Sequence, residues 1–105
     1  MTIELTSENF QREVLEAGVP VLVDFWGPWC PPCRKIAPLI DELAASADGK
    51  YRVGKVNVGE QGDLADRYKV SGIPTLLLFK GGQIVNKFVG VQGRTTLARA
   101  LSEAA

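Results

Sequence analysis

The sequence predicts an α/β fold: a three-layer α/β/α sandwich around a central mixed sheet of five strands, with four helices. Short apolar runs alternate with segments of helical periodicity, and strands separated by helices favour a parallel sheet with helices on both faces. The last two apolar runs are joined by Gly81-Gly82, which predicts a hairpin and therefore an antiparallel pair. The length of 105 residues and the hydrophobic content of 46% fit one domain over residues 1–105.

The first elements are a short strand at residues 3–5, a short amphipathic helix and a second strand at residues 19–26. The second strand is nearly continuously apolar and rich in β-branched and aromatic residues, as expected of a strand that is covered on both faces. The helix between them has an apolar face at spacings of three and four residues, with candidate caps before it and a glycine after it: the face is Phe10, Val14 and Ala17, the caps are Thr6 and Ser7, and the stop is Gly18.

A longer helix is predicted from Cys33 to about Ala47, because Ile36, Ile40 and Leu43 recur at helical spacing. Pro38 should bend this helix, since proline removes one hydrogen bond of its ladder.

The second half of the chain predicts three strands and two helices. Residues 51–58 alternate as a strand does, Leu64 and Tyr68 mark a short helix, and residues 75–79 form an apolar strand. The glycine turn then leads into a strand at 83–89, and a closing helix is predicted over 95–104. The order of elements is therefore β, α, β, α, β, α, β, β, α.

Composition excludes several classes of function. Lys plus Arg equals Asp plus Glu, at 12 each, and no run of like charge appears, so a nucleic-acid or anionic-membrane binder is not expected. No segment approaches the roughly 18 to 20 apolar residues of a membrane span, and the first residues do not resemble a signal peptide. We therefore expect a cytoplasmic protein whose partners are proteins or small molecules. The chain has no histidine, which excludes a Cys/His nucleophile pair.

The only two cysteines, Cys30 and Cys33, lie in the stretch "WCPPCR". A zinc or iron-sulfur site would need ligands that the chain lacks, since it has no further cysteine and no histidine. A purely structural disulfide would close too small a loop to remove much chain entropy. A redox pair has a positive physical case: the N–H groups and dipole at a helix N-terminus lower the pKa of a thiol such as Cys30, and the spacing places Cys33 within disulfide reach. Arg34 and Lys35 add positive charge or simply face solvent.

Asp24 interrupts the apolar strand 19–26, where burial should raise its pKa. By strand parity it shares a face with Leu22 and Trp26. It is interpreted either as one half of a buried pair with Lys55, or as a carboxyl beneath Cys33 that accepts the proton of that thiol. The two interpretations are compatible.

The segment "VDFWGPWCPPCRKIAP" resembles the active site of the thioredoxin family, and the likeness continues through "GKVNV", "SGIPTLLLFKGG" and "FVG". The resemblance implies the thioredoxin fold and a protein-disulfide reductase. It further implies Cys30 as nucleophile, Cys33 as resolving cysteine, Asp24 as proton acceptor and Lys55 as the residue that tunes it. By the same resemblance, Pro74 has a cis peptide bond beside the disulfide.

The resemblance also implies a flat apolar docking surface for protein disulfides, in which Ile73 offers backbone groups to an extended substrate segment. Its residues are Trp29, Gly72, Ile73, Pro74, Val89 and Gly90. The expected partners are disulfide-containing proteins and a thioredoxin reductase that draws on NADPH. No bound cofactor or metal is expected, and the protein is expected to act as a monomer.

The sequence departs from the family pattern at three places. Pro31 stands where glycine is commonest; with Pro32 it leaves the Cys30 sulfur to donors from Cys33 onward, while stiffening the turn, so the two prolines tune the redox potential. Gly27-Pro28 and Gly59 also differ, the latter replacing an acid. Three alternatives remain at this point: a periplasmic oxidant or isomerase, a binding subunit without redox turnover, and a metal carrier.

Overall fold

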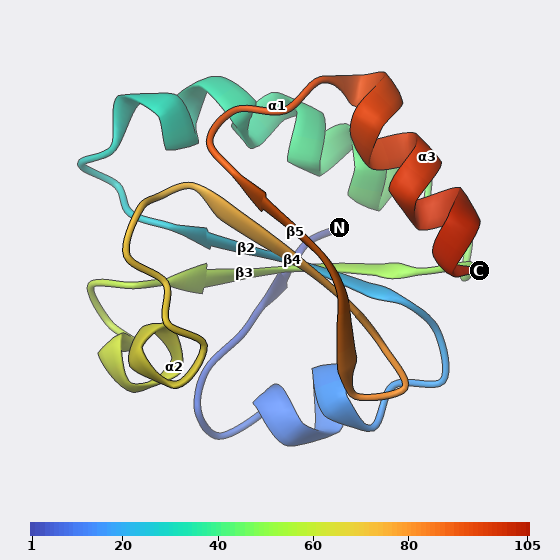
Figure 1. Cartoon of the computed structure of the whole chain (residues 1–105), viewed down its shortest axis with the longest axis horizontal. Helices are drawn as coiled ribbons and strands as arrows, with labels where there is room; N and C mark the ends of the chain where they lie inside the picture. Colours follow the sequence, from blue (N-terminus) through green and yellow to red (C-terminus); the bar gives the residue numbers. More distant parts are fainter.

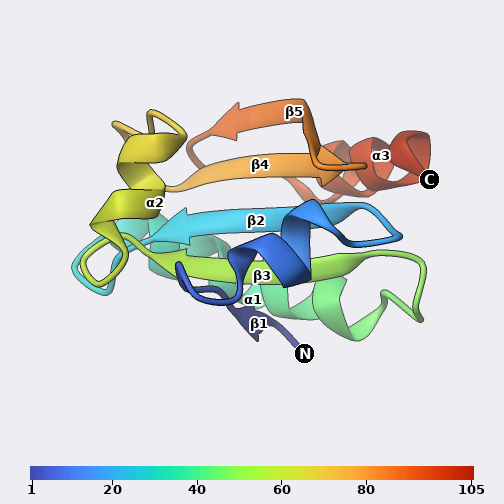
Figure 2. The same ribbon diagram turned by 90° about the horizontal axis from the view of Figure 1, so that it is seen from below.

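The computed structural model describes all 105 residues and contains one five-stranded mixed sheet, in the order β1-β3-β2-β4-β5 (Figures 1 and 2). β1, β3 and β2 are parallel, and β4 and β5 are each antiparallel to the preceding neighbour in the sheet. The predicted mixed sheet of five strands is therefore confirmed. The strands are β1 (Ile3–Glu4), β2 (Val21–Trp26), β3 (Arg52–Asn57), β4 (Thr75–Lys80) and β5 (Gln83–Val89).

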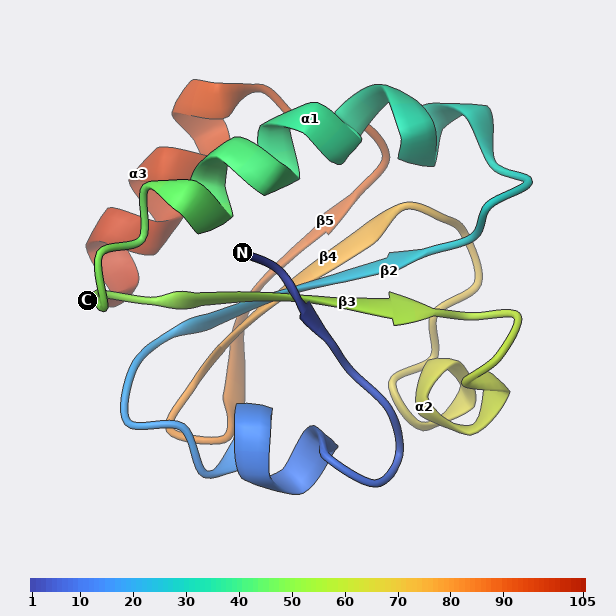
Figure 3. The same ribbon diagram turned by 180° about the vertical axis from the view of Figure 1, so that it is seen from behind.

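Four helical segments cover the two faces of the sheet, as Figures 1 and 3 show. α1 and α3 pack together on one face, whereas η1, a short π-helical turn, and α2 lie on the other. The predicted three-layer arrangement is thus confirmed. None of the helices has the length and apolar character needed to cross a membrane. The helical segments are η1 (Gln11–Leu15), α1 (Pro31–Ala45), α2 (Gly62–Arg67) and α3 (Arg94–Ala104).

β2 lies in the middle of the sheet and contributes to both apolar layers. Val21, Val23 and Phe25 pack on the side of η1 and α2, whereas Leu22 packs beneath α1 and α3. Successive side chains of a strand point to opposite faces, so Asp24 shares the Leu22 face, as strand parity predicted. One carboxyl is therefore placed among the apolar side chains beneath α1.

α1 begins at Pro31, two residues earlier than predicted, and ends at Ala45 rather than near Ala47. The earlier start has a simple cause, because proline lacks only an N–H that the first helical turn leaves unpaired, and its φ already suits a helix. Pro38 lies within the helix, and Ile36 and Ile40 are buried against the sheet. Cys30 is the N-cap residue of this helix.

η1 is shorter than the helix predicted around Phe10, Val14 and Ala17, and its N-cap residue, Phe10, makes no side-chain capping hydrogen bond. The predicted cap Thr6 instead bonds within the turn that precedes η1. Thr6 Oγ1 accepts the N–H of Glu8, and the side chain of Asn9 accepts the N–H of Thr6. Ser7 is not a cap: its N–H and hydroxyl both donate to Gln61 Oε1, which ties the segment to the start of α2.

The β4–β5 hairpin turns at Gly81 and Gly82, as predicted. Their φ values are +59° and +78°, the left-handed region at both central residues that glycine adopts at little cost. The turn places β5 at the edge of the sheet, and β5 ends beside the segment that leads into β4.

Candidate active site

The two cysteines lie just beyond the carboxyl end of β2, where the chain turns into α1. Residues 27–30 form a tight turn in which the N–H of Cys30 donates to the carbonyl of Gly27 at 3.1 Å, with Pro28 at the second position of the turn. The central strand and the helix start therefore hold the Cys-Pro-Pro-Cys segment from both sides, as the order of elements predicted.

Cys30 and Cys33 are joined by a disulfide, with their Cα atoms 5.3 Å apart. Both are buried, but Cys30 is the more exposed, at 6% against 2% for Cys33. The N–H of Cys33 donates to Cys30 Sγ at 3.2 Å. Because Pro31 and Pro32 have no N–H, this is the first backbone donor after Cys30, as expected from the sequence.

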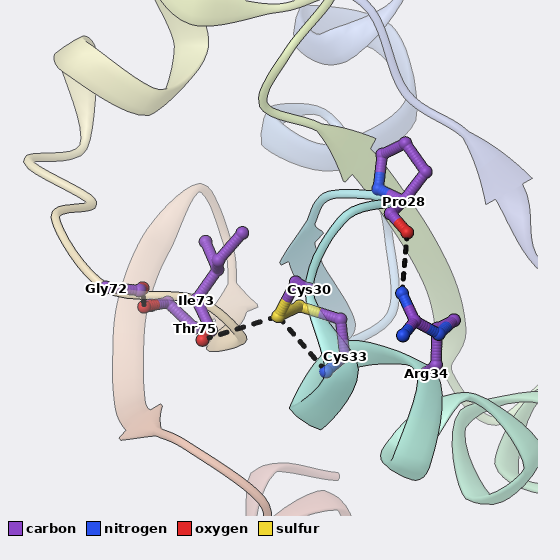
Figure 4. The surroundings of a disulfide bond; sticks show 7 residues. All are labelled: Pro28, Cys30, Cys33, Arg34, Gly72, Ile73 and Thr75. Carbon is purple, nitrogen blue, oxygen red and sulfur yellow. Dashed lines mark hydrogen bonds between the residues drawn. A yellow bond between two sulfur atoms is a disulfide. The ribbon is translucent and has the colours of Figure 1, made fainter.

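The segment from Gly72 to Thr75 faces the disulfide (Figure 4). The carbonyl oxygen of Ile73 lies 3.7 Å from Cys30 Sγ, and the Ile73–Pro74 peptide bond is cis, as the resemblance implied. The bonded sulfur carries no proton, so the contact with Ile73 becomes a hydrogen bond only when Cys30 is a thiol. Pro74 itself is buried.

β5 completes this side of the site. Val89 pairs with Thr75 in the sheet and is 60% exposed, and the N–H of Gly90 donates to the carbonyl of Pro74 at 2.8 Å. Gly90 has a φ of +89°, which favours glycine. The structure thus brings together Gly72, Ile73, Pro74, Val89 and Gly90.

Asp24 is buried, at 1% exposure, and neither carboxyl oxygen has a hydrogen-bond partner. Burial raises the pKa of Asp24 from its ordinary value of 3.8 to about 6; the positive charge of Lys55 opposes this rise and the negative charge of Asp41 adds to it. A buried carboxyl without partners that titrates near neutral pH can take up and release a proton under physiological conditions. The sequence-based expectation of a raised pKa agrees with this environment.

Lys55 is the direct cross-strand neighbour of Asp24 in the β2–β3 pair, but the two do not form an ion pair. The Lys55 Nζ instead lies 4.5 Å from the ring centre of Trp26, a cation–π contact. The predicted buried ion pair is therefore wrong in its geometry. Trp26 is half-buried and belongs to neither core cluster.

Two contacts of the site were not identified from the sequence. Arg34 Nη1 donates to the carbonyl of Pro28 at 2.8 Å, and the buried hydroxyl of Thr75 donates to the carbonyl of Gly72 (Figure 4). Both contacts join a side chain to the backbone across a turn. The only sign of either contact in the sequence is Thr75, a threonine that directly follows Pro74 at the start of an apolar strand.

Trp29 is 60% exposed and lies directly before Cys30. Its ring lies against Gly27 and Gly59. No group of three or more His, Cys, Asp or Glu side chains is arranged to hold a metal ion.

Comparison with known proteins identifies the family. The sequence model of the thioredoxin family matches residues 1–103. The chain is 49% identical to thioredoxin 1 of Nostoc sp. over 95% of this chain and 94% of the relative, and 45% identical to thioredoxin of Synechocystis sp. over 97% and 95%. It is also 42% identical to a bifunctional thioredoxin reductase/thioredoxin of Mycobacterium leprae, over 98% of this chain and 22% of that protein.

These relatives cover the chain nearly end to end, and the Cys30–Cys33 pair stands at the start of the helix that follows the central strand. Such a pair stores two electrons as a reversible disulfide, so the protein is a thiol-disulfide oxidoreductase of the protein-disulfide reductase type. The chain belongs to the thioredoxin family.

Proposed function

We propose that the protein reduces disulfides of other proteins in two exchange steps, with Cys30 as nucleophile and Cys33 as resolving cysteine. The observation that carries this assignment of roles is the difference between the two sulfurs. Cys30 caps α1, accepts the N–H of Cys33 and is the more exposed, whereas Cys33 lies within the first turn of the helix. A sulfur that accepts a backbone N–H at a helix N-terminus is stabilised as a thiolate.

In the first step the Cys30 thiolate attacks one sulfur of the substrate disulfide, forming a mixed disulfide and releasing the other sulfur as a thiolate, which takes a proton from water. In the second step the Cys33 thiolate attacks Cys30 Sγ, forming the Cys30–Cys33 disulfide and releasing the remaining substrate sulfur. The substrate gains two electrons and two protons, and the protein loses them. The sulfurs store the electron pair, so the exchange needs no bound cofactor.

Asp24 accepts the proton of Cys33 before the second step, and Lys55 tunes it. Support comes from the burial of Asp24, from its lack of hydrogen-bond partners and from its pKa of about 6, which is close to physiological pH. Lys55 opposes the rise of this pKa from the neighbouring strand while its ammonium group is held over Trp26.

The docking surface for the substrate consists of Trp29, Gly72, Ile73, Pro74, Val89 and Gly90. Trp29 and Val89 are exposed apolar side chains, and the Ile73 backbone lies beside Cys30 Sγ, where it can pair with an extended segment of the substrate. Pro31 and Pro32 tune the redox potential through the turn between the cysteines.

The oxidised protein is recycled by a thioredoxin reductase, with NADPH as the indirect source of electrons. The relative from Mycobacterium leprae, named a bifunctional thioredoxin reductase/thioredoxin, supports a reductase as partner. All proposed site residues come from one chain, which acts as a single domain and as a monomer. A reductant of protein disulfides works in a compartment that keeps thiols reduced, so we assign the protein to the cytoplasm.

Cysteine replacement tests the proposed roles. Cys33→Ser should accumulate mixed disulfides between Cys30 and cellular proteins, identified by non-reducing mass spectrometry, whereas Cys30→Ser should accumulate none. Trapping by Cys30→Ser alone would reverse the roles. Wild-type protein should also consume NADPH in the presence of a thioredoxin reductase and a protein disulfide. If only this second experiment fails, the reductase is not the partner, while the roles of the two cysteines still hold.

A further inference from the structure

The indole ring of Trp29 rests on two glycines from different loops. Gly27 belongs to the turn between β2 and α1, and Gly59 belongs to the loop between β3 and α2. A Cβ atom added at Gly27 would lie 2.6 Å from Trp29 Cζ2 and 2.7 Å from Cε2 and Cη2; one added at Gly59 would lie 2.9 Å from Cζ3 and 3.0 Å from Cη2. The ring occupies the space that a side chain at either position would need.

Backbone conformation does not explain why glycine occupies either position. Neither Gly27 nor Gly59 has a φ in the left-handed region, unlike Gly49, Gly81, Gly82 and Gly90. Since φ does not require glycine, the requirement comes from the surroundings: from the ring at Gly27, and at Gly59 from the ring together with Asn57 Oδ1, which would lie 3.2 Å from an added Cβ. These are two of the places at which the sequence departs from the family pattern, and the structure joins them through one side chain.

Hydrogen bonds hold both glycines in place. The carbonyl of Gly27 accepts the N–H of Cys30 at 3.1 Å, and the N–H of Gly59 donates to Asn57 Oδ1 at 2.9 Å. The seat for the ring is therefore built into the turn that carries the nucleophile and into the end of β3. Much of Trp29 nevertheless stays open to solvent, since the residue is 60% exposed.

We propose that Gly27 and Gly59 are positioning residues that hold Trp29 as a preformed part of the docking surface, and that this seat favours protein disulfides over small ones. The proposal rests on the proposed function of Trp29 in docking. A side chain that is already immobilised loses little further freedom when a partner binds, which lowers KM for a substrate large enough to cover it. A small disulfide that reaches only Cys30 gains nothing from the seat.

The test uses Gly27→Ala and Gly59→Ala in the full chain. The closest atoms that must move belong to the exposed Trp29 side chain, so both variants should fold. KM for a protein disulfide, insulin, should rise about 2- to 10-fold, the factor that corresponds to immobilising one side chain. Reduction of glutathione disulfide should be unchanged. Of the two indole N–H signals in a nitrogen-15 NMR spectrum, only one should shift. Gly62→Ala is the matched control, because a Cβ there meets nothing within 4 Å.

A Trp29→Ala background separates the possible outcomes. If Trp29→Ala raises KM for insulin and Gly27→Ala adds no further increase to it, the glycine acts through the ring and the proposal stands. If Trp29→Ala raises KM but both glycine variants leave KM and the indole signals unchanged, the seat is overturned while docking by Trp29 survives. If Trp29→Ala leaves KM unchanged, the docking role itself is wrong. The seat is also overturned if Gly62→Ala raises KM for insulin as much as the two glycine variants do, or if those variants reduce glutathione disulfide as poorly as they reduce insulin.

Discussion

Asp24 and Lys55 are direct cross-strand neighbours on β2 and β3, yet the ammonium group of Lys55 lies over the Trp26 ring and not on the Asp24 carboxylate. This separation leaves the carboxyl buried and unpartnered. A tight ion pair would hold Asp24 ionised. In the observed arrangement the charge of Lys55 cancels only part of the rise in pKa that burial causes, which leaves the pKa of Asp24 at about 6. A proton acceptor for a thiol needs such an intermediate state, because it must both take up and release the proton.

Asp24→Asn should slow resolution by Cys33 more than attack by Cys30. Asparagine keeps the shape of the side chain but cannot accept the proton, and loss of a general base costs about 10²-fold at the lower end of the usual range. Reaction of the reduced protein with dithiobis-nitrobenzoate separates the steps, since the first nitrothiobenzoate released reports attack and the second reports resolution. The difference in the rate of resolution between Asp24→Asn and wild type should narrow as the pH rises, because hydroxide can then take the proton in place of the carboxylate. Equal slowing of both steps would contradict the role of Asp24.

Asp24 should also make stability depend on pH. Its pKa is raised from 3.8 in the unfolded chain to about 6 in the folded protein, so the folded state binds the proton more tightly. This contribution to stability is fully present below pH 3.8 and is lost as the pH rises through about 6. Between pH 3 and pH 8 the stability of Asp24→Asn relative to wild type should increase by about 3 kcal/mol. Urea unfolding of the oxidised proteins measures it, and a difference that does not vary with pH would contradict the raised pKa.

Thr75→Val should weaken docking without changing the chemistry of the cysteines. Valine has the shape of threonine but cannot donate to the Gly72 carbonyl, so the segment that carries Ile73 and Pro74 loses its internal tie. One neutral hydrogen bond contributes about 1 kcal/mol, which corresponds to roughly a 5-fold rise in KM for a protein disulfide. Thr75→Ser keeps the donor and should restore most of the affinity. If Ser and Val behave alike, the hydroxyl does not position the segment.

Much of the fold is predictable because its elements have strong local patterns. β2 is a continuous apolar run, the β4–β5 turn needs two glycines with positive φ, and the face of Asp24 follows from strand parity alone. The Cys30–Cys33 pair is equally local, since three residues at a helix start place the two sulfurs together. These features depend on neighbours within a few positions.

The features that were missed depend on contacts between distant segments. Lys55 lies over Trp26 because β2 and β3 are paired directly, and Trp29 lies against Gly59 because that pairing brings the loops that follow the two strands together. The early start of α1 has a local cause, because two consecutive prolines fit both the turn before a helix and its first two residues.

That start changes the expected effect of Pro31. An N-cap side chain accepts from the second or third helical residue. Pro31 occupies the first position and Pro32 the second, so Pro32 removes a potential donor to Cys30 Sγ whereas Pro31 does not. The effect of Pro31 on the redox potential is therefore expected to come from the stiffness of the turn.

Arg34 clamps the turn that carries Trp29 and Cys30, through its bond to the Pro28 carbonyl at 2.8 Å. Arg34→Lys keeps the positive charge near the cysteines but should not reproduce the reach and planar geometry of the guanidinium. The variant therefore distinguishes the effect of the charge from the effect of the hydrogen bond to Pro28. The loss of stability should be small, about 0.5–1 kcal/mol, because the contact is exposed. Exchange of the Cys30 N–H, which bonds to Gly27 within this turn, should become faster in Arg34→Lys and in Arg34→Ala alike. If exchange is faster only in Arg34→Ala, the charge is sufficient and the hydrogen bond to Pro28 does not hold the turn.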